Sequence, residues 1–391
     1  MQVLVTSTPG AGHVLPMVPM VLALRGAGHS VCWATGPEAG PWMGRMGLEH
    51  LAAGLDAGPR GRAALELVGG IAELPPAERR AVIGPATFGR VAAGPMADDL
   101  RGILDDDPPD LVLTEPCELA APALATARGI PYATIGFGGL LPDEVVASMA
   151  EAVAQIWAAE GLVVPEDAGL YRHQYLHPFP PAMGAVPEGL PIAPLRPGGA
   201  DLAVGDPPDW VAPLGVERQL VYVTFGTEFG AQAPFDPVLD ALGHLDVDVV
   251  VTVGGTIDRA TLPAVADNVR IEAFVPQRAL LERAALVVSH GGSGTVLGAA
   301  ASGVPQLCVP LGADQFDNAA AVAGAGLGAC LLPAAVTAAG VFEECLDLLS
   351  EPPPAVGRIA GEIAAMPSAA QHVGTISALR PAGRRTGRTP R

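Results

Sequence analysis

Short apolar runs alternate along the chain with longer alanine-rich segments, and this alternation gives the first view of the fold. In the first half, helices are expected at 14–27 and 119–128, and strands at 2–6, 30–34, 110–113 and 132–135. Each strand run is four or five residues long and mostly apolar, whereas each helical run is longer and is followed closely by a glycine. Strands that alternate with helices in this way are typical of a parallel sheet covered by helices on both faces.

The same alternation restarts after a stretch at 187–215 that is rich in proline and glycine and has no periodicity. Beyond it, a helix is expected at 296–302, and strands at 220–225, 247–253, 269–273 and 286–289. The prediction is therefore an α/β protein with two doubly wound, Rossmann-like domains facing a central cleft. Their boundaries are expected at 1–200 and 217–375, joined by a linker at 201–216 and followed by a basic, disordered tail at 376–391.

The chain has 391 residues, and arginine supplies all 22 of its basic residues because it contains no lysine. This absence excludes a lysine Schiff base, a lysine nucleophile and a Walker A phosphate site. The 41 acidic residues give a formal net charge of −19, which is the wrong sign for a nucleic-acid binder.

Half of the residues are hydrophobic, yet no uninterrupted apolar run reaches the roughly 18 residues that a membrane helix needs. The first residues, MQVLVTS, have no basic segment and read as a first strand rather than a secretory leader. The five cysteines are scattered, with no zinc-type pair among them, at Cys32, Cys117, Cys308, Cys330 and Cys345. These features predict a cytoplasmic protein with no membrane association.

A glycine-rich loop at 289–295 (SHGGSGT) lies between a predicted strand and a predicted helix. Loop amides and the helix dipole favour an anion at such a place, and glycines allow its close approach. Without lysine, a diphosphate here would be held by amides, hydroxyls, arginine or the His290 imidazole. The strand-end loop at 225–227 would meet the same phosphates. The alternative is a structural turn around a buried histidine.

The loop after the first strand, at 7–13 (STPGAGH), departs from the dinucleotide-binding pattern GxGxxG. The third glycine is replaced by Leu15, and Glu38 lies beyond the end of the second strand. A nicotinamide-dependent enzyme is therefore a weak alternative.

The segment 274–328 contains FVPQ, SHGGSGT, GVPQLCVPLGADQFDNA and GAG. Together these motifs resemble the nucleotide-sugar signature of family-one glycosyltransferases with the GT-B fold. The resemblance is strongest to the actinobacterial enzymes that decorate polyketides and other natural products, and the domain pattern extends it over the whole chain.

The resemblance implies a set of donor-binding residues. His290 and the loop residues would bind the diphosphate, Val275 and Gln277 would border the base and ribose, and Asp314 and Gln315 would hydrogen-bond the sugar hydroxyls. The full set is Thr227, Val275, Gln277, His290, Gly292, Ser293, Gly294, Thr295, Asp314 and Gln315. For Asp314 and Gln315 the alternative is a solvated loop or a helix cap.

The same resemblance implies the catalytic pair. The segment 12–16 (GHVLP) matches the family's GHxxP, whose histidine is the general base, so His13 would deprotonate the acceptor hydroxyl. Glu115 stands where the family commonly has an aspartate, and it would orient and stabilise the imidazole. Glu118 is a competing candidate for that task. The alternative for His13 is a helix cap or a core position between the domains.

Two DxD sequences, at 105–107 and 246–248, match a metal motif of another glycosyltransferase fold, but neither belongs to the predicted phosphate loop. No required metal and no cofactor are therefore expected. The acceptor pocket is expected within 55–100 and 137–185. Aromatic and methionine residues there would line it or, alternatively, pack in the core; they are Met149, Trp157, Tyr171, Tyr175, Phe179 and Met183.

The resulting hypothesis is an inverting glycosyltransferase that moves a sugar from a TDP- or UDP-sugar to a hydrophobic natural-product aglycone. Its expected partners are these two small molecules, with a homodimer possible. A nucleotide-sugar epimerase or hydrolase would share the phosphate loop but lack an acceptor pocket. A non-catalytic partner of another transferase is a further alternative, against which the intact His13 and His290 argue.

Overall fold

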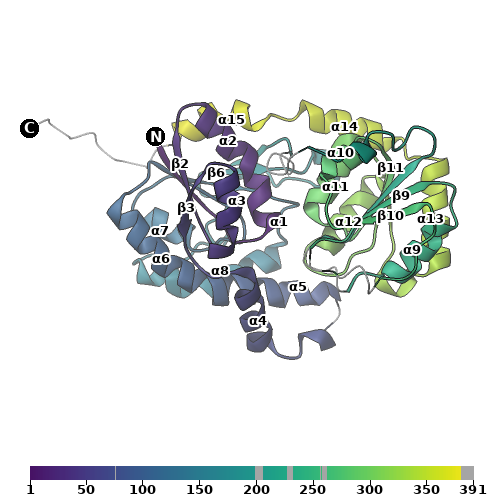
Figure 1. Cartoon of the computed structure of the whole chain (residues 1–391). Coiled ribbons are helices and arrows are strands. Elements are labelled where there is room, and N and C mark those ends of the chain that lie inside the picture. The colour runs from purple at the N-terminus through teal and green to yellow at the C-terminus, as the bar shows by residue number, and fades with distance from the viewer. Residues whose placement is uncertain (75, 199–205, 227–231, 256, 258–261, 380–391) are drawn as a thin grey trace, which may run out of the picture.

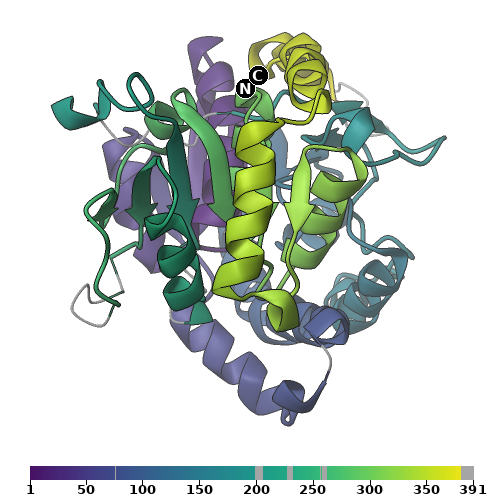
Figure 2. The same ribbon diagram turned by 90° about the vertical axis from the view of Figure 1, so that its right-hand side faces the viewer.

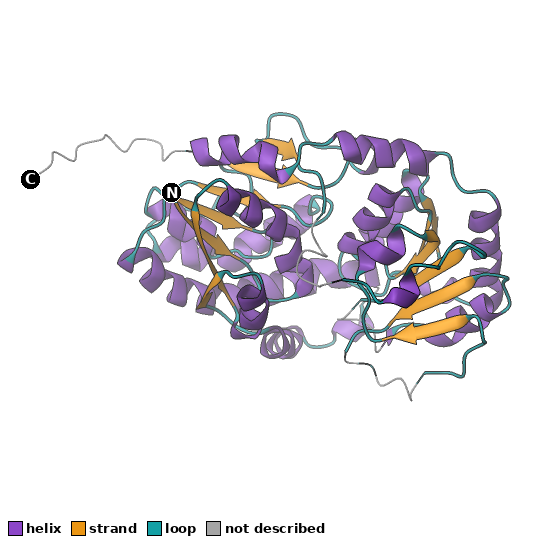
Figure 3. Ribbon diagram, turned by 45° about the horizontal axis from the view of Figure 1, so that its top comes forward, coloured by secondary structure: helices purple, strands orange, loops and turns teal. Residues whose placement is uncertain are grey.

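The computed structural model describes the chain except for residues 75, 199–205, 227–231, 256, 258–261 and 380–391. Two parallel sheets lie side by side, each with helices on both faces, as Figures 1 and 3 show. The first sheet has the strand order β3-β2-β1-β4-β5-β6-β7. Its strands are β1 Gln2–Thr6, β2 Ser30–Thr35, β3 Glu49–Ala52, β4 Leu111–Thr114, β5 Tyr132–Ile135, β6 Gln174–His177 and β7 Ile192–Pro194.

The second sheet has the order β10-β9-β8-β11-β12-β13, and its paired strands are again all parallel. Its strands are β8 Leu220–Thr224, β9 Asp248–Thr252, β10 Val269–Glu272, β11 Ala284–Ser289, β12 Gln306–Cys308 and β13 Gly328–Cys330. Figure 2 views the molecule from this side. The predicted two-domain, doubly wound architecture is confirmed.

The helices of the first domain are α1 Ala11–Val14, α2 Val18–Gly26, α3 Gly40–Arg45, α4 Ala57–Val68, α5 Pro76–Gly84, α6 Ala93–Asp106, α7 Ala121–Ala127 and α8 Asp143–Ala159. A π-helix, Pro85–Ala92, joins α5 to α6. The remaining helices are α9 Phe235–Gly243, α10 Gln277–Leu281, α11 Ser293–Ser302, α12 Gln315–Gly324, α13 Ala338–Ser350, α14 Ala355–Ala365 and α15 Ala369–Ala378.

Side chains alternate between the two faces of each buried strand, and this alternation explains why helices pack on both faces of each sheet. Val3 and Val5 of β1 pack with α2 on one face of the first sheet, whereas Leu4 packs with α6 on the other. In the second sheet, Val221 and Val223 of β8 pack with α9 and α13. Successive side chains of a strand point to opposite faces, so short apolar runs serve two cores at once.

The end of the chain returns to the first domain. Helix α15 packs against α2, and Ile376 of α15 is fully buried in the first domain's core. Helices α14 and α15 run along one side of both domains (Figure 1). Residues 376–378, expected to begin a disordered tail, are instead the last turn of a helix, and 380–391 lie outside the described residues.

The proline- and glycine-rich stretch 187–215 contains regular structure, although its sequence shows no periodicity. Its β7 strand pairs with β6 and completes the first sheet, and Leu195 is buried in the first core. Val211, in a short 3-10 helix, is buried in the second domain. A three-residue edge strand beside prolines gives almost no periodic signal, so the pattern missed it.

No helix among the described residues is long and apolar enough to cross a membrane.

His177 at the end of β6 gives a testable pH dependence of stability. Its side chain is buried, and burial lowers the pKa of the imidazole to about 4. The unfolded chain, with a histidine pKa of about 6.5, takes up this proton first, so stability falls as the pH drops from about 6.5 towards 4. Through this group, the wild type should lose about 3 kcal/mol of unfolding free energy over that pH range. A His177→Phe variant lacks the group, so its loss over the same range should be smaller by that amount.

The measurement is urea unfolding at a series of pH values. The matched control is His244→Gln, whose imidazole is 75% exposed and should leave the wild-type pH dependence unchanged. Parallel pH profiles for the wild type and His177→Phe would contradict this account.

Candidate active site

The carboxyl ends of the central strands bring the predicted site residues together. In the first domain, the loop after β1 leads into α1 with His13, and Glu115 follows β4, which pairs with β1. In the second domain, the glycine loop follows β11 and leads into α11. Gly138, in the loop after β5, lies against Ser293 of the second domain. The two strand-end edges therefore face one another, as expected for ligands of open α/β sheets.

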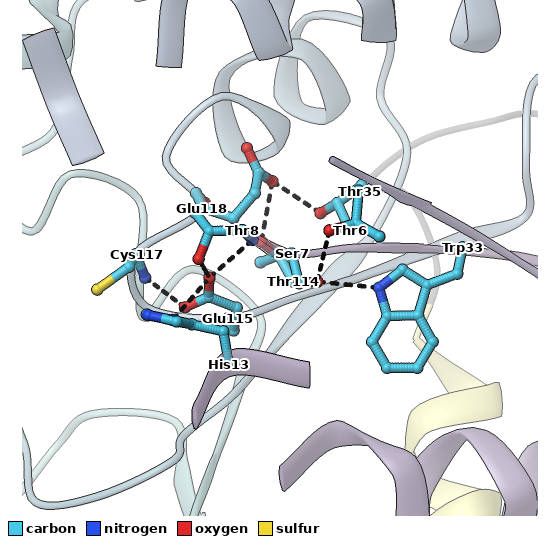
Figure 4. Close-up of polar contacts among 10 residues, drawn as sticks. All are labelled: Thr6, Ser7, Thr8, His13, Trp33, Thr35, Thr114, Glu115, Cys117 and Glu118. Atoms are coloured by element: carbon cyan, nitrogen blue, oxygen red, sulfur yellow. Dashed lines mark hydrogen bonds and ion pairs between the residues drawn. The ribbon is translucent and has the colours of Figure 1, made fainter. Parts of the chain in front are cut away.

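His13 and Glu115 face each other across these loops (Figure 4). His13 Nδ1 lies 3.3 Å from Glu115 Oε1, and the carboxylate is completely buried while the imidazole is 18% exposed. Glu115 also accepts hydrogen bonds from the Thr8 N–H (3.1 Å), the Thr8 hydroxyl (3.0 Å) and the Cys117 N–H (2.7 Å). The carboxylate is thus fixed by the β1 loop and its own loop, with one oxygen towards the imidazole.

The Glu115 carboxyl is ionised despite its burial. Burial alone would raise its pKa, but the neighbouring His13 and the hydrogen bonds from Cys117 and Thr8 hold the pKa below the ordinary value. A buried carboxylate with these partners fixes an imidazole's tautomer and stabilises its protonated form.

Glu118 points elsewhere. Its carboxyl accepts hydrogen bonds from the Thr6 hydroxyl (2.7 Å), the Thr114 hydroxyl (3.1 Å) and the Ala120 N–H (2.9 Å), at the start of α7. Burial raises the pKa of this carboxyl, with a smaller contribution from the charge of Glu115. Of the two candidate carboxylates, the geometry therefore pairs Glu115 with His13 and gives Glu118 a place between β1, β4 and α7.

Two phenylalanines that the sequence did not single out enclose the imidazole. The ring centroid of His13 lies 5.4 Å from that of Phe88 and 5.1 Å from that of Phe137, the latter edge-on at 75°. Phe88 belongs to the π-helix, a form often found at functional sites. No periodicity in the sequence signals a π-helix, so Phe88 had no recognisable signal.

A cavity of about 10 Å³, room for a single water, has a mainly apolar wall that includes Leu55, Phe88, Met96 and Leu119. Part of its lining, from Leu55 to Met96, lies within 55–100, one of the stretches expected to bind the acceptor, and the rest comes from the loops after β1, β3 and β4. The aromatic and methionine candidates are mostly core residues instead. Met149 and Trp157 are buried in the first domain, Tyr175 is buried too, and Tyr171 packs partly buried against that core.

Phe179 and Met183 serve a different purpose from the one proposed for them. Both are buried against α11, α12 and α14 of the second domain, so they fasten the two domains together.

Helix α11 begins with three amides that are suited to an anion. Gly292 caps the helix, and the first intrahelical bond runs from the Val296 N–H to the Gly292 carbonyl. The N–H groups of Ser293, Gly294 and Thr295 precede that bond, so the helix itself provides them with no acceptor. Its first turn contains no acidic residue. These N–H groups and the helix dipole favour a phosphate at this end.

The His290 ring lies between two glycines. A Cβ atom at Gly226 or at Gly292 would lie 2.9 Å or 2.6 Å from His290 Nε2, so neither glycine tolerates a side chain without a shift. Burial lowers the pKa of this imidazole, opposed by a backbone contact at Thr224 and the charge of Asp314. Burial therefore favours the neutral form of the His290 imidazole over the cation.

A hydrogen-bond network joins the glycine loop to α12. Ser293 Oγ donates to Asp314 Oδ2 at 2.6 Å, and the Asn318 amide donates to the Gly291 carbonyl (2.9 Å), Ser293 Oγ (3.0 Å) and Asp314 Oδ2 (3.0 Å). Asn318 was not among the predicted site residues. Its spacing of four from Asp314 puts both on one helical face, which is the signal that would have found it.

The other predicted residues for binding the nucleotide sugar have some of their polar groups occupied by contacts within the protein, are buried, or lie outside the described residues. The Gln315 side-chain oxygen accepts from the Leu311 N–H (2.8 Å) and the Gly312 N–H (3.0 Å), which leaves only its NH₂ for a ligand. Gln277 donates to the Thr295 hydroxyl at 2.9 Å. The Val275 side chain is buried in the core, so only its backbone can face a nucleotide. Thr227 lies outside the described residues.

Among the described residues, His13, Glu115 and Cys117 form a group of potential metal ligands whose donor atoms lie within 4.8 Å of one another. The two DxD segments lie elsewhere. Asp107 contacts Gln2 at the start of β1, and Asp248 begins β9, where it pairs with Arg218 at 3.0 Å. Both segments are therefore at the amino-terminal edges of the sheets, opposite the strand ends that carry the candidate site.

The fold and the glycine loop together define a GT-B glycosyltransferase, and comparison with known proteins identifies the family. Residues 236–379 match the model of the erythromycin biosynthesis protein CIII-like C-terminal domain. The chain is 34% identical over 344 residues to the L-demethylnoviosyl transferase of Streptomyces niveus, covering 85% of each protein. It is 30% identical to the aklavinone 7-beta-L-rhodosaminyltransferase of Streptomyces galilaeus, over 97% of this chain and 96% of that one.

Solved structures agree with this assignment. The glycosyltransferase SsfS6 of Streptomyces sp. SF2575, complexed with thymidine diphosphate, superposes with a TM-score of 0.78 at 26% identity, covering 96% of this chain and 99% of that one. The spinosyn rhamnosyltransferase SpnG, also complexed with thymidine diphosphate, gives a TM-score of 0.81 at 26% identity, covering 96% and 100%. This chain belongs to the GT-B glycosyltransferases of actinobacterial antibiotic biosynthesis.

The two buried glutamates provide a matched pair of variants. Glu115→Gln should lower kcat for sugar transfer by about 10²-fold or more, because a neutral amide no longer stabilises the His13 imidazolium. Glu118→Gln removes an equally buried carboxylate that makes no contact with His13, and it should keep kcat within about threefold. Initial rates with a TDP-sugar and an accepted aglycone measure both. Equal losses in the two variants would contradict the assignment of Glu115.

Proposed function

We propose that the protein transfers a hexose, in an inverting reaction, from a TDP-sugar to a hydrophobic natural-product aglycone. The observation that carries this proposal is the pairing of His13 with the buried Glu115 carboxylate, opposite the amino-terminal end of α11 across the domain boundary. Thymidine diphosphate in two structural neighbours favours TDP over UDP. Aklavinone and 10-deoxymethynolide are named in the descriptions of relatives, and they favour a hydrophobic, polycyclic or macrocyclic acceptor.

In the proposed reaction, the acceptor hydroxyl lies next to the His13 imidazole. Because Nδ1 of His13 faces Glu115, the other ring nitrogen, Nε2, takes the hydroxyl proton as the acceptor oxygen attacks the anomeric carbon. The new carbon–oxygen bond forms on one face of the sugar while the bond to the β-phosphate oxygen breaks on the other. The electron pair of the broken bond leaves on the nucleoside diphosphate, so the anomeric configuration inverts.

The leaving diphosphate would be stabilised by neutral donors. The amides of Ser293, Gly294 and Thr295 and the neutral His290 imidazole supply hydrogen bonds at the end of α11. Asp314, held by Ser293 and Asn318, would accept from the sugar hydroxyls, and Gln315 would donate its NH₂.

Replacing the proposed base tests the function directly. A His13→Ala variant should lose about 10²–10⁴-fold in kcat, which is the usual contribution of a general base. Its affinity for thymidine diphosphate, measured by calorimetry, should stay within about twofold, because His13 belongs to the other domain. Transfer to an aglycone at nearly the wild-type rate would overturn the assignment of His13.

Metal independence is a separate prediction, and the His13–Glu115–Cys117 cluster makes its test necessary. In the proposed reaction His13 accepts a proton and is not a metal ligand, so dialysis against EDTA should leave kcat within about twofold. A large loss of transfer that added Mg²⁺ or Zn²⁺ restores would show instead that a metal ion takes part.

A further inference from the structure

The dipeptide Phe137-Gly138, in the loop after β5, touches both halves of the candidate site. Phe137 packs edge-on against the His13 imidazole, with ring centroids 5.1 Å apart. Gly138, the next residue, lies against Ser293 and Asp314 of the second domain. One short segment of the first domain thus contacts the proposed base on one side and the donor-site network on the other.

The contact at Gly138 leaves no room for a side chain. A Cβ atom there would overlap Ser293 Oγ, and it would lie 3.1 Å from Ser293 Cβ and 3.5 Å from Asp314 Oδ2. Gly138 does not have the left-handed φ that excludes side chains on other grounds. Close approach of the second domain is therefore the reason for glycine at this position, rather than backbone conformation.

Across this contact, Ser293 and Asp314 are held in place by hydrogen bonds to each other and from Asn318. Ser293 Oγ donates to Asp314 Oδ2 at 2.6 Å, and Asn318 donates to both side chains at 3.0 Å. A methyl group at Gly138 would have to disturb this network or move the domains apart. Either change alters the position of the donor relative to His13.

We propose that Phe137-Gly138 is a positioning element that sets the separation between the base and the donor sugar. Phe137 holds the imidazole from the side, and Gly138 fixes how closely the donor-site network approaches it. The two residues act through His13 and Ser293 and have no chemical role of their own. This inference rests on the proposed function, because it concerns the same base and the same donor site.

The test is a Gly138→Ala variant. Because a displacement of about 1 Å between reacting groups costs on the order of 10²-fold in rate, kcat for transfer should fall by about 10- to 100-fold. TDP-rhamnose and aklavinone are the probe substrates. The melting temperature should change little, because the added methyl lies at the domain boundary and not in a core.

The matched control is Gly184→Ala. Gly184 is also in an irregular segment of the first domain, and a Cβ atom there would lie 4.0 Å from the Phe179 ring, an ordinary contact. Its kcat should equal that of the wild type. A wild-type kcat in Gly138→Ala as well would overturn the inference.

A double-mutant cycle separates this contact from a general disturbance of the loop. Ser293→Gly removes the atoms that the new methyl would meet, so Gly138→Ala should cost less than about threefold in the Ser293→Gly background. An equal loss of kcat in both backgrounds would show that the effect does not pass through Ser293, which would overturn the proposal.

A cross-link tests the contact without any substrate. In a variant carrying both Gly138→Cys and Ser293→Cys, mild oxidation should join the two peptides: their Cβ atoms would lie 3.1 Å apart, so a shift of less than about 1 Å brings them to the roughly 3.5–4.5 Å that a disulfide requires. Mass spectrometry of the digested protein detects the linked pair, with the two single variants as controls. If oxidation never links these peptides, the approach does not occur in solution and the inference fails.

Failure of the positioning role and failure of the proposed function give different experimental results. If the wild type transfers sugar and the cross-link is absent, only the positioning role is lost. If the cross-link forms but no TDP-sugar is ever transferred or bound, the proposed function is lost.

Discussion

The carboxylate of Glu115 must remain ionised in the interior of the protein, and the first domain is arranged around this requirement. A buried charge without partners costs several kcal/mol. Here the Thr8 N–H and hydroxyl, the Cys117 N–H and the His13 ring share the carboxylate. These groups come from the ends of β1 and β4, which pair in the sheet. The parallel pairing thus stabilises the charge, and the charge in turn orients the imidazole.

The donor side follows a different electrostatic principle. The chain has no lysine, and its glycine loop offers amides, hydroxyls and a His290 imidazole kept neutral by burial. Neutral donors bind a diphosphate without the strong charge pairing that would slow its release. The acidic network of Asp314, Ser293 and Asn318 lies beside this loop. The absence of lysine, at first only an exclusion, is consistent with a site that holds a departing leaving group.

Sequence reasoning succeeded where a local pattern was strong. The strands at 2–6 and 132–135 agree with the structure residue for residue. The helix predicted at 296–302 is present as α11, which begins three residues earlier, at Ser293, and ends at Ser302. Glu115 was preferred to Glu118 on motif position alone, and the structure places the Glu115 carboxylate beside His13 Nδ1; its role in orienting His13 stays a prediction.

The failures have physical causes. The three-residue strands β7, β12 and β13 are too short for a periodic signal, and α15 packs on the first domain through tertiary contacts that no local pattern encodes. Buried aromatic residues look alike whether they line a pocket or fill a core, so Trp157 and Phe179 were ambiguous. Phe88 reaches His13 through a π-helix, and Gly138 matters because of a residue 155 positions away, so neither could be recognised from its neighbours in sequence.

The proposed reaction is a single displacement in which His13, backed by Glu115, deprotonates an acceptor while the diphosphate leaves from the opposite face of the sugar. The most direct test is the anomeric configuration of the product, determined by proton NMR and compared with that of the TDP-sugar donor. One displacement predicts that the configuration is inverted. A product that retains the donor's configuration would contradict the account.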